Sequence, residues 1–123
     1  MMADIKLTLA EDKRRAPSIE AEARRLQDEG WLYYPIQGQP VRAKPGCWVY
    51  FIRGDHMVAR AEAENFERSE NATSLYDGTP LPAGKWMVKC IPPMEIARRR
   101  PPHKGFQGFR YVAGSDGFAD AFD

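Results

Sequence analysis

The chain has 123 residues, of which 43% are hydrophobic and 28% are charged, with a formal net charge of +1. This length and composition are typical of one globular domain that can bury a core without a disulfide or a metal ion. A net charge so close to zero excludes a polycationic protein, so a nucleic-acid-binding surface would have to come from local clusters of basic residues.

The two cysteines, Cys47 and Cys90, lie within apolar strand-like stretches and are interpreted as buried, reduced thiols. A zinc site with His56 and His103 would need the spacings C-x8-H and C-x12-H, which match no standard close pair of ligands. The chain also lacks an apolar leader and any apolar run near the ~18 residues of a membrane span. We therefore expect a cytoplasmic protein with no metal, no other cofactor and no membrane partner.

A short strand and a helix are predicted near the N-terminus. Residues Ile5–Leu9 alternate between apolar and polar side chains, which predicts a strand. Ser18 is a favourable N-cap, and Gly30 is suited to the position just past a helix C-terminus. Apolar residues recur at helical spacing between them. The sequence thus predicts a helix over Ile19–Glu29 that packs one face on a sheet.

The centre of the chain predicts a β-hairpin. An aromatic stretch, Trp31–Ile36, precedes it as a further strand or extended segment. Cys47–Ile52 is almost continuously apolar, as in a strand that is buried on both faces, and Arg53–Asp55 forms a turn. Residues Met57–Glu64 then alternate with period two. That alternation places Met57, Ala59, Ala61 and Ala63 together on one face.

The C-terminal half predicts an irregular connection, further strands and a tail. Residues 66–82 are polar and rich in turn residues, and Lys85–Ile91 reads as a strand that Pro92 and Pro93 end. Residues 104–112 finish in another strand. We expect an α+β fold over residues 1–113, a small mixed, mostly antiparallel β-barrel of five to six strands with one or two short helices. Residues 114–123 are expected to form a flexible acidic tail.

The order of these elements resembles the PUA-like superfamily, including its ASCH and EVE branches. The resemblance rests on Lys44–Ile52, a Pro-Gly turn that enters an apolar strand, and on Met57–Ala63, a returning strand of V-A-R-A-E-A type. Trp86–Ile91 and Gly108–Tyr111 are similar to the closing strands of such a barrel. The ASCH signature G-x-K-x-x-E-x-R is absent, and Cys47 stands where an Asp is usual. The resemblance implies binding of RNA, or of a nucleotide that is flipped out of a duplex.

Aromatic side chains supply one part of such a site. A flipped base is held between aromatic or apolar side chains, and each stacking contact is worth ~1–3 kcal/mol. Core packing is the ordinary role of any one of these rings. The candidates for a base-stacking pocket are Trp31, Tyr33, Trp48 and Trp86.

Basic side chains supply the other part. Arginines and a lysine gather near residues 98–110 among glycines and aromatics, a composition expected of a surface that follows phosphates. The same residues could instead form a solvated run that protects an edge strand from pairing. The candidate nucleic-acid-binding residues are Arg98, Arg99, Arg100, Lys104 and Arg110.

The favoured function is therefore a nucleic-acid-binding module, with RNA and DNA both open and no catalytic residue assigned. One alternative is a protein-interaction or small-ligand-binding domain of the same fold, in which the arginines would lie far from the pocket. A second alternative, implied by the ASCH resemblance, is a small amidohydrolase that acts on modified nucleosides with a Lys, a Glu and a Thr. Lys6, Glu62 and Thr8 are available for those roles.

Overall fold

The computed structural model describes residues 3–9, 17–69 and 85–123. One α-helix, α1 (Ile19–Glu29), accompanies six strands and two short 3-10 helices. The strands are β1 (Ile5–Thr8), β2 (Leu32–Pro35), β3 (Trp48–Arg53), β4 (His56–Ser69), β5 (Lys85–Ile96) and β6 (Phe109–Tyr111), and the 3-10 helices are η1 (Gly114–Asp116) and η2 (Ala119–Phe122).

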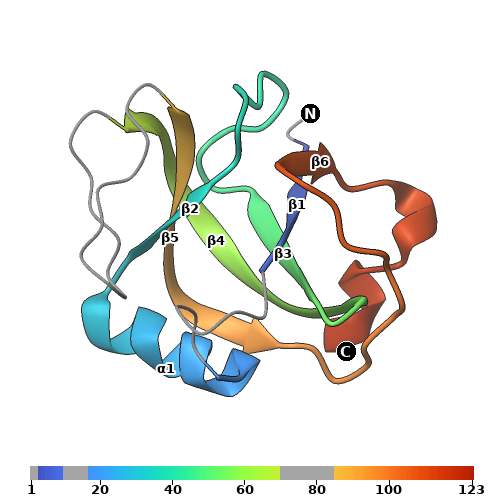
Figure 1. Ribbon diagram of the computed structural model, residues 1–123. Coiled ribbons are helices and arrows are strands. Elements are labelled where there is room, and N and C mark those ends of the chain that lie inside the picture. The colour runs from blue at the N-terminus through green and yellow to red at the C-terminus, as the bar shows by residue number, and fades with distance from the viewer. Residues whose placement is uncertain (1–2, 10–16, 70–84) are drawn as a thin grey trace.

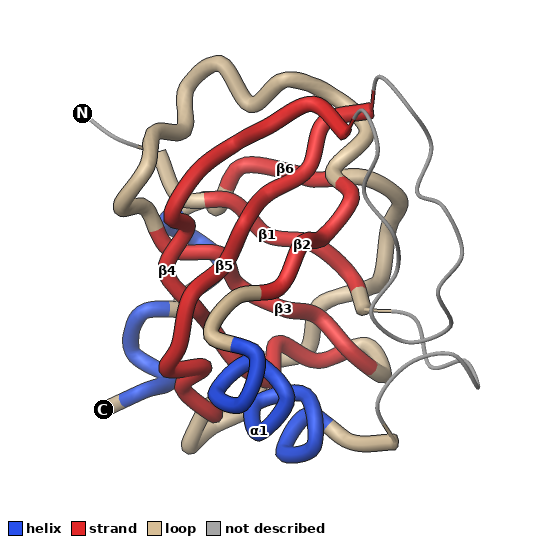
Figure 2. The backbone as a smooth tube through the Cα atoms, turned by 90° about the vertical axis from the view of Figure 1, so that its left-hand side faces the viewer, coloured by secondary structure: helices blue, strands red, loops and turns tan. Residues whose placement is uncertain are grey.

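The six strands form one mixed sheet in the order β2-β5-β4-β3-β1-β6. β1 and β3 run parallel, whereas every other neighbouring pair is antiparallel. The sheet curls into a half-barrel (Figures 1 and 2). This confirms a small, mostly antiparallel α+β fold, but the barrel is not closed, because the described edge strands β2 and β6 do not pair with each other.

The two edges nevertheless approach each other closely at Gly108, just before β6. An added Cβ atom there would lie 3.3 Å from Oε1 of Gln37 and 3.4 Å from the carbonyl oxygen of Ile36. Gly108 also has φ of +71°, in the left-handed region that favours glycine. A glycine at this position therefore lets the chain turn into β6 against the end of β2.

Two hydrophobic clusters occupy the two faces of the sheet. Successive residues of β3 point to opposite faces, so Val49 and Phe51 join the main core with residues of α1, whereas Tyr50 and Ile52 join a second cluster. The second cluster also contains Phe118 and Ala121 from the last ten residues, 114–123, which we call the C-terminal segment. In Figure 1, α1 and the C-terminal segment accordingly lie on different sides of the sheet.

The helix begins and ends where the sequence predicts. Oγ of Ser18 accepts a hydrogen bond from the Ala21 N–H at 3.1 Å, and Gly30, at φ of 82°, donates its N–H to the Leu26 carbonyl at 2.9 Å. α1 also carries a buried carboxylate, Glu22, which accepts a hydrogen bond from the hydroxyl of Tyr34 at 2.6 Å. This bond ties the helix to β2.

Strands β4 and β5 are longer than predicted. Residues Phe66–Ser69 were expected in an irregular connection, but they continue β4 by pairing with Lys85–Val88 of β5. The remainder of that expected connection, 70–82, lies outside the described residues. Pro92 and Pro93 do not end β5, because they lie at a register shift opposite β4, between the pairs Glu62↔Ile91 and Arg60↔Glu95. A proline has no N–H to donate, which a strand tolerates at such an irregularity.

Met57 lies on the opposite face of the sheet from the one predicted, because β4 contains a bulge. The register between β3 and β4 shifts between Phe51, which pairs with Ala59, and Ile52, which pairs with Met57. Met57 consequently joins the second cluster, whereas Ala59 lies in the main core with Ala61 and Ala63. A bulge adds one residue to a strand and so reverses the alternation on one side of it.

The expected flexible tail is instead folded onto the sheet. Residues 114–123 contain η1 and η2, and Phe118 and Ala121 are only 2% and 3% exposed. Ala121 also accepts hydrogen bonds at its carbonyl oxygen from the N–H groups of Arg98 and Arg99. The domain boundary expected after residue 113 therefore does not separate the last ten residues from the core.

Candidate functional site

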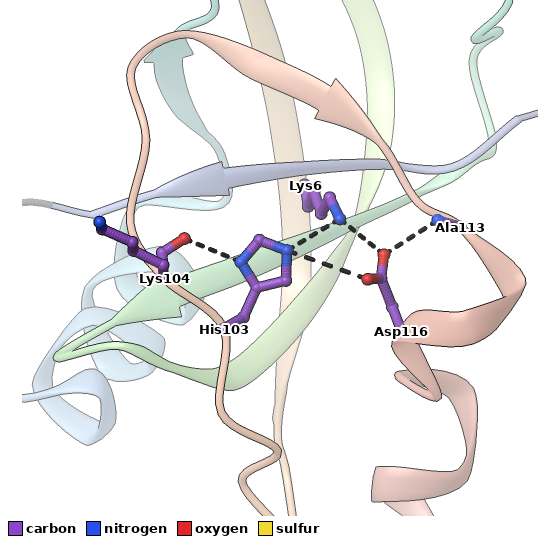
Figure 3. A network of polar contacts seen from close by, with 5 residues as sticks. All are labelled: Lys6, His103, Lys104, Ala113 and Asp116. Carbon is purple, nitrogen blue, oxygen red and sulfur yellow. Dashed lines mark hydrogen bonds and ion pairs between the residues drawn. The ribbon is translucent and has the colours of Figure 1, made fainter.

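A cluster of three polar side chains links this C-terminal segment to the sheet (Figure 3). Lys6 of β1 is buried, and its Nζ lies 2.8 Å from Nε2 of His103 and 2.6 Å from Oδ2 of Asp116. Lys6 pairs in register with Tyr50 of β3, so its side chain points to the face that the C-terminal segment covers. The cluster therefore joins β1 to two segments from the end of the chain.

The contacts of His103 fix the position of its proton. Nδ1 lies 2.8 Å from the carbonyl oxygen of Lys104, which can only accept a hydrogen bond, so Nδ1 carries the proton. Nε2 lies 2.8 Å from the ammonium group of Lys6, which can only donate, so Nε2 is the acceptor of that contact and carries no proton. His103 is accordingly a neutral imidazole in this arrangement.

Asp116 connects the cluster to the backbone of the C-terminal segment. Burial alone would raise the pKa of Asp116, but the hydrogen bonds from Lys6 and from the Ala113 N–H outweigh it, and the pKa is lowered. The Ala113 N–H lies 2.9 Å from Oδ2 of the carboxylate. Asp116 is therefore held ionised between a buried cation and the residue that precedes η1.

A pocket of about 450 Å³ lies on the same face, and we call it the Tyr50 pocket. This volume lies within the range of small-molecule sites. Its walls come from the two residues just before β1 (Ala3 and Asp4), from Arg42, from Tyr50, and from seven residues between Val112 and Asp120. The C-terminal segment therefore forms much of this pocket.

The lining of the Tyr50 pocket combines aromatic and polar groups. The rings of Tyr50 and Phe118 lie 5.4 Å apart between their centroids. Asp4 is oriented by the backbone N–H of Trp48, which donates to its Oδ1 at 2.9 Å, and the guanidinium group of Arg42 stacks 4.5 Å from the ring centroid of Tyr111. The residues that line the pocket thus include two aromatic residues, a carboxylate residue and an arginine.

A second hollow, of about 320 Å³, lies beside the first, and we call it the arginine hollow. It is lined by Arg99, Arg100, Pro101 and Ala121, together with Gly117 and Asp120. Gly117 and Asp120 also line the Tyr50 pocket, so the two depressions adjoin each other at these residues.

The arginines of this hollow are held by exposed groups. Nη2 of Arg99 donates to the carbonyl oxygen of Asp120 at 2.7 Å, and Nη2 of Arg100 lies 3.2 Å from Oε1 of Glu20 on α1. The Arg100 and Glu20 side chains are 46% and 53% exposed. An ion pair this exposed contributes little, so an incoming anion can replace Glu20 at modest cost.

The five predicted basic residues are therefore only partly brought together. Arg99 and Arg100 line the hollow, and Arg98 is exposed in the same turn. Lys104 is exposed beside His103. Arg110 belongs to β6, where its guanidinium group stacks 4.6 Å from the ring centroid of Phe106.

The four predicted stacking residues lie in different places. Trp31 and Tyr33 contact each other at 5.3 Å between ring centroids, and Lys89 lies over Trp31. Trp86 packs partly buried against the main core. Trp48 packs against the second cluster, and the guanidinium group of Arg60 already stacks 4.2 Å from its ring centroid. These rings come from separate parts of the sheet, and none of them lines the Tyr50 pocket.

The residues considered for an amidohydrolase are not assembled either. Lys6 is engaged by His103 and Asp116, and Oγ1 of Thr8 accepts a hydrogen bond from the Phe106 N–H at 3.0 Å. Glu62 is exposed on β4, which is separated from β1 by β3, so it is roughly 10 Å away across the sheet.

Sequence reasoning missed most residues of the Tyr50 pocket and of the polar cluster. Asp4, Arg42, Tyr50, His103, Asp116 and Phe118 are scattered along the chain and form no motif of fixed spacing. One signal was present, because a lysine at the centre of an alternating strand, as Lys6 is, needs a buried partner if its face is covered.

Among the described residues, the side chains that could bind a metal ion are not grouped into a site. Cys47 and Cys90 are buried free thiols, as the sequence predicts, and burial together with the charge of Asp4 raises the pKa of Cys47 to about 11. Within residues 3–9, 17–69 and 85–123, no group of three His, Cys, Asp or Glu side chains is arranged to hold a metal ion. In the same ranges no helix has the length and apolarity to cross a membrane.

Comparisons of the chain with models of known families, with curated proteins and with solved structures give no match. Any assignment of function to the protein must therefore rest on the geometry of its own residues.

Proposed function

We propose that the protein is a nucleic-acid-binding module, of the PUA-like kind that the sequence pattern resembles, which holds one unpaired base in the Tyr50 pocket. The observation that carries this proposal is that the arginine hollow adjoins the pocket, since both are lined by Gly117 and Asp120. A nucleotide has the same two parts, a planar base and a phosphate joined to it through the sugar. A base in the pocket would place its neighbouring phosphate toward Arg99 and Arg100.

The lining of the pocket matches the chemistry of a base. The edge of a base presents hydrogen-bond donors and acceptors, and Asp4 can accept while Arg42 can donate. Tyr50 and Phe118 add aromatic atoms to the lining, and each is 2% exposed, so a base would contact only a small part of each ring. These residues replace Trp31, Tyr33, Trp48 and Trp86 as our candidates for contact with the base.

The position of the arginines favours this function over a small-ligand site without a nucleic acid. A pocket for an uncharged small ligand needs no cation beside it, whereas phosphate contacts from arginine provide most of the affinity for a nucleic acid. Arg99 and Arg100 line the hollow next to the pocket and keep their side chains at the surface.

The test is fluorescence anisotropy with labelled single-stranded and duplex RNA and DNA at two salt concentrations. We expect single strands to bind, and Arg99→Ala or Arg100→Ala to weaken binding about tenfold, the value of one charged hydrogen bond. Each variant should also reduce the salt slope by about 0.7, as expected for one lost phosphate contact on a single strand. Lys85→Ala, which removes an exposed charge from β5, is the matched control.

A second comparison isolates the base. An oligonucleotide with one abasic site keeps its phosphates and loses one ring, so it should bind the wild-type protein more weakly than the intact strand. Arg42→Ala and Asp4→Asn should reduce that difference, and Asp4→Asn keeps an oxygen for the Trp48 N–H. Absence of binding at low salt, or affinities that do not change in the Arg99 and Arg100 variants, would rule out the proposal.

A further inference from the structure

We propose that His103 is a pH-sensitive switch for the Tyr50 pocket: the neutral imidazole fixes the C-terminal wall of the pocket, and the protonated imidazole releases it. The proposal rests on the proposed function, because it concerns the regulation of binding in the same pocket. It is carried by the geometry of the cluster of Lys6, His103 and Asp116 (Figure 3).

The arrangement requires His103 to be neutral. Its Nδ1–H donates to the Lys104 carbonyl and its Nε2 accepts from the Lys6 ammonium group, both at 2.8 Å. A proton added to Nε2 would turn this acceptor into a donor that faces another donor. It would also set two positive charges at hydrogen-bond distance, so the contact between Lys6 and His103 cannot persist in its present form.

The other charged groups around His103 compensate for this change only in part. Asp116, in η1, has its Oδ1 3.9 Å from Nε2, but its Oδ2 already accepts from Lys6 at 2.6 Å. Asp55, in the turn between β3 and β4, accepts the backbone N–H of His103 at its carbonyl oxygen, and its carboxylate accepts the backbone N–H of Gly105. Lys104 is adjacent in sequence, and Arg110 stacks on Phe106, which contacts the imidazole ring. After protonation, two cations would therefore share the single carboxylate of Asp116.

The change would reach the pocket through Asp116 and Phe118. Oδ2 of Asp116 accepts the Ala113 N–H as well as the Lys6 ammonium group, and Ala113 lines the pocket. The ring of Phe118 packs between those of His103, at 5.6 Å, and Tyr50, at 5.4 Å, and it also lines the pocket. Displacement of Lys6 or of the imidazole ring therefore disturbs two contacts that position the wall.

The composition of the chain makes the switch testable. It contains two histidines, His56 and His103, and histidine is the side chain whose charge ordinarily changes between about pH 5 and pH 8. Asp116 stays ionised over this range, because its pKa is lowered. His56 is exposed, and its Nδ1 contacts the Gly54 carbonyl, so it serves as the control histidine.

The experiment measures the affinity for a labelled single-stranded RNA or DNA between pH 5.5 and pH 8 in wild type, His103→Gln and His56→Gln. We expect affinity to fall on acidification in wild type and in His56→Gln, by at most about tenfold per pH unit, because one proton is involved. His103→Gln should remove this dependence. A histidine that only added charge near a phosphate would strengthen binding in acid, and that result would overturn the proposal.

A second measurement does not depend on any nucleic acid. Amide hydrogen exchange of residues 113–121, corrected for the intrinsic effect of pH, should speed up in acid in wild type but not in His103→Gln. Should His103→Gln fail to fold, His103→Asn is the second neutral variant. If no oligonucleotide binds but exchange responds to His103, the proposed function fails while the switch in the C-terminal segment stands. If oligonucleotides bind with the same pH dependence in wild type and in His103→Gln, the function stands and the switch is refuted.

Discussion

Lys6 and Asp116 lie 110 positions apart in the chain, yet Nζ of one is 2.6 Å from Oδ2 of the other. Their side chains are only 7% and 14% exposed, so each desolvated charge depends on the other. Loss of either partner leaves a buried ion without its counter-charge, which makes this pair a sensitive point for stability.

Asp116→Asn should lower the free energy of unfolding by about 3 kcal/mol at pH 7, as expected when one partner of a buried ion pair is removed. The pKa of Asp116 is lowered in the folded protein, so its contribution is full above the unfolded value and is lost as the pH falls through the folded value. The difference between wild type and variant should therefore shrink below about pH 4. Urea unfolding at pH 7 and at pH 3 measures it, with the exposed Asp28→Asn as control. An equal difference at both pH values would contradict this account.

Tyr34→Phe should destabilise the protein more than Tyr33→Phe, although the two residues are neighbours in β2. The Tyr34 hydroxyl donates to the buried carboxylate of Glu22, whereas the Tyr33 hydroxyl donates to Glu67 in a half-buried environment. We expect about 2 kcal/mol for the first change and less than about 1 kcal/mol for the second. Denaturant midpoints of the two variants test the order. Equal midpoints would show that the bond to Glu22 stabilises the fold no more than the bond to Glu67.

Gly108→Ala should destabilise the fold by about 2 kcal/mol, since a left-handed conformation costs a residue with a Cβ atom about 1–2 kcal/mol before any crowding is counted. The new methyl group would also meet Gln37 and Ile36 across the gap between the sheet edges. Gly114→Ala is the matched control, because no atom lies within 4 Å of its added Cβ. Thermal unfolding of both variants should show a lower melting temperature for Gly108→Ala than for Gly114→Ala. A Gly108→Ala protein as stable as the control would mean that the edges do not approach as described.

Phe118→Ala should cost about 3–4 kcal/mol, the usual price of removing a buried phenylalanine ring. Phe118 is 2% exposed and packs on Tyr50 in the second cluster, so the loss would leave a cavity on the β3 face. A residue in a flexible tail would give no measurable change. Chemical unfolding followed by tryptophan fluorescence therefore decides whether the last ten residues belong to the folded domain.

The sequence alone was sufficient for the elements whose limits depend on local chemistry. Ser18 and Gly30 bound α1 because a capping hydroxyl and a left-handed glycine act within one turn of the helix. The apolar run of β3 and the turn at Gly54 and Asp55 were likewise predicted, since both residues of that turn adopt positive φ. The same holds for the buried thiols of Cys47 and Cys90.

Tertiary structure alone decided the rest, because the deciding contacts join distant parts of the chain. Pairing with β5 extends β4 through residues 66–69, and a shift in pairing admits Pro92 and Pro93 into a strand. The short acidic sequence 114–123 carries too little local signal to predict order, and it folds because Phe118 and Ala121 find an apolar face on β3 and β4. His103 meets Lys6 across 97 positions for the same reason: a buried ammonium group needs an acceptor, and only the completed fold brings one within reach.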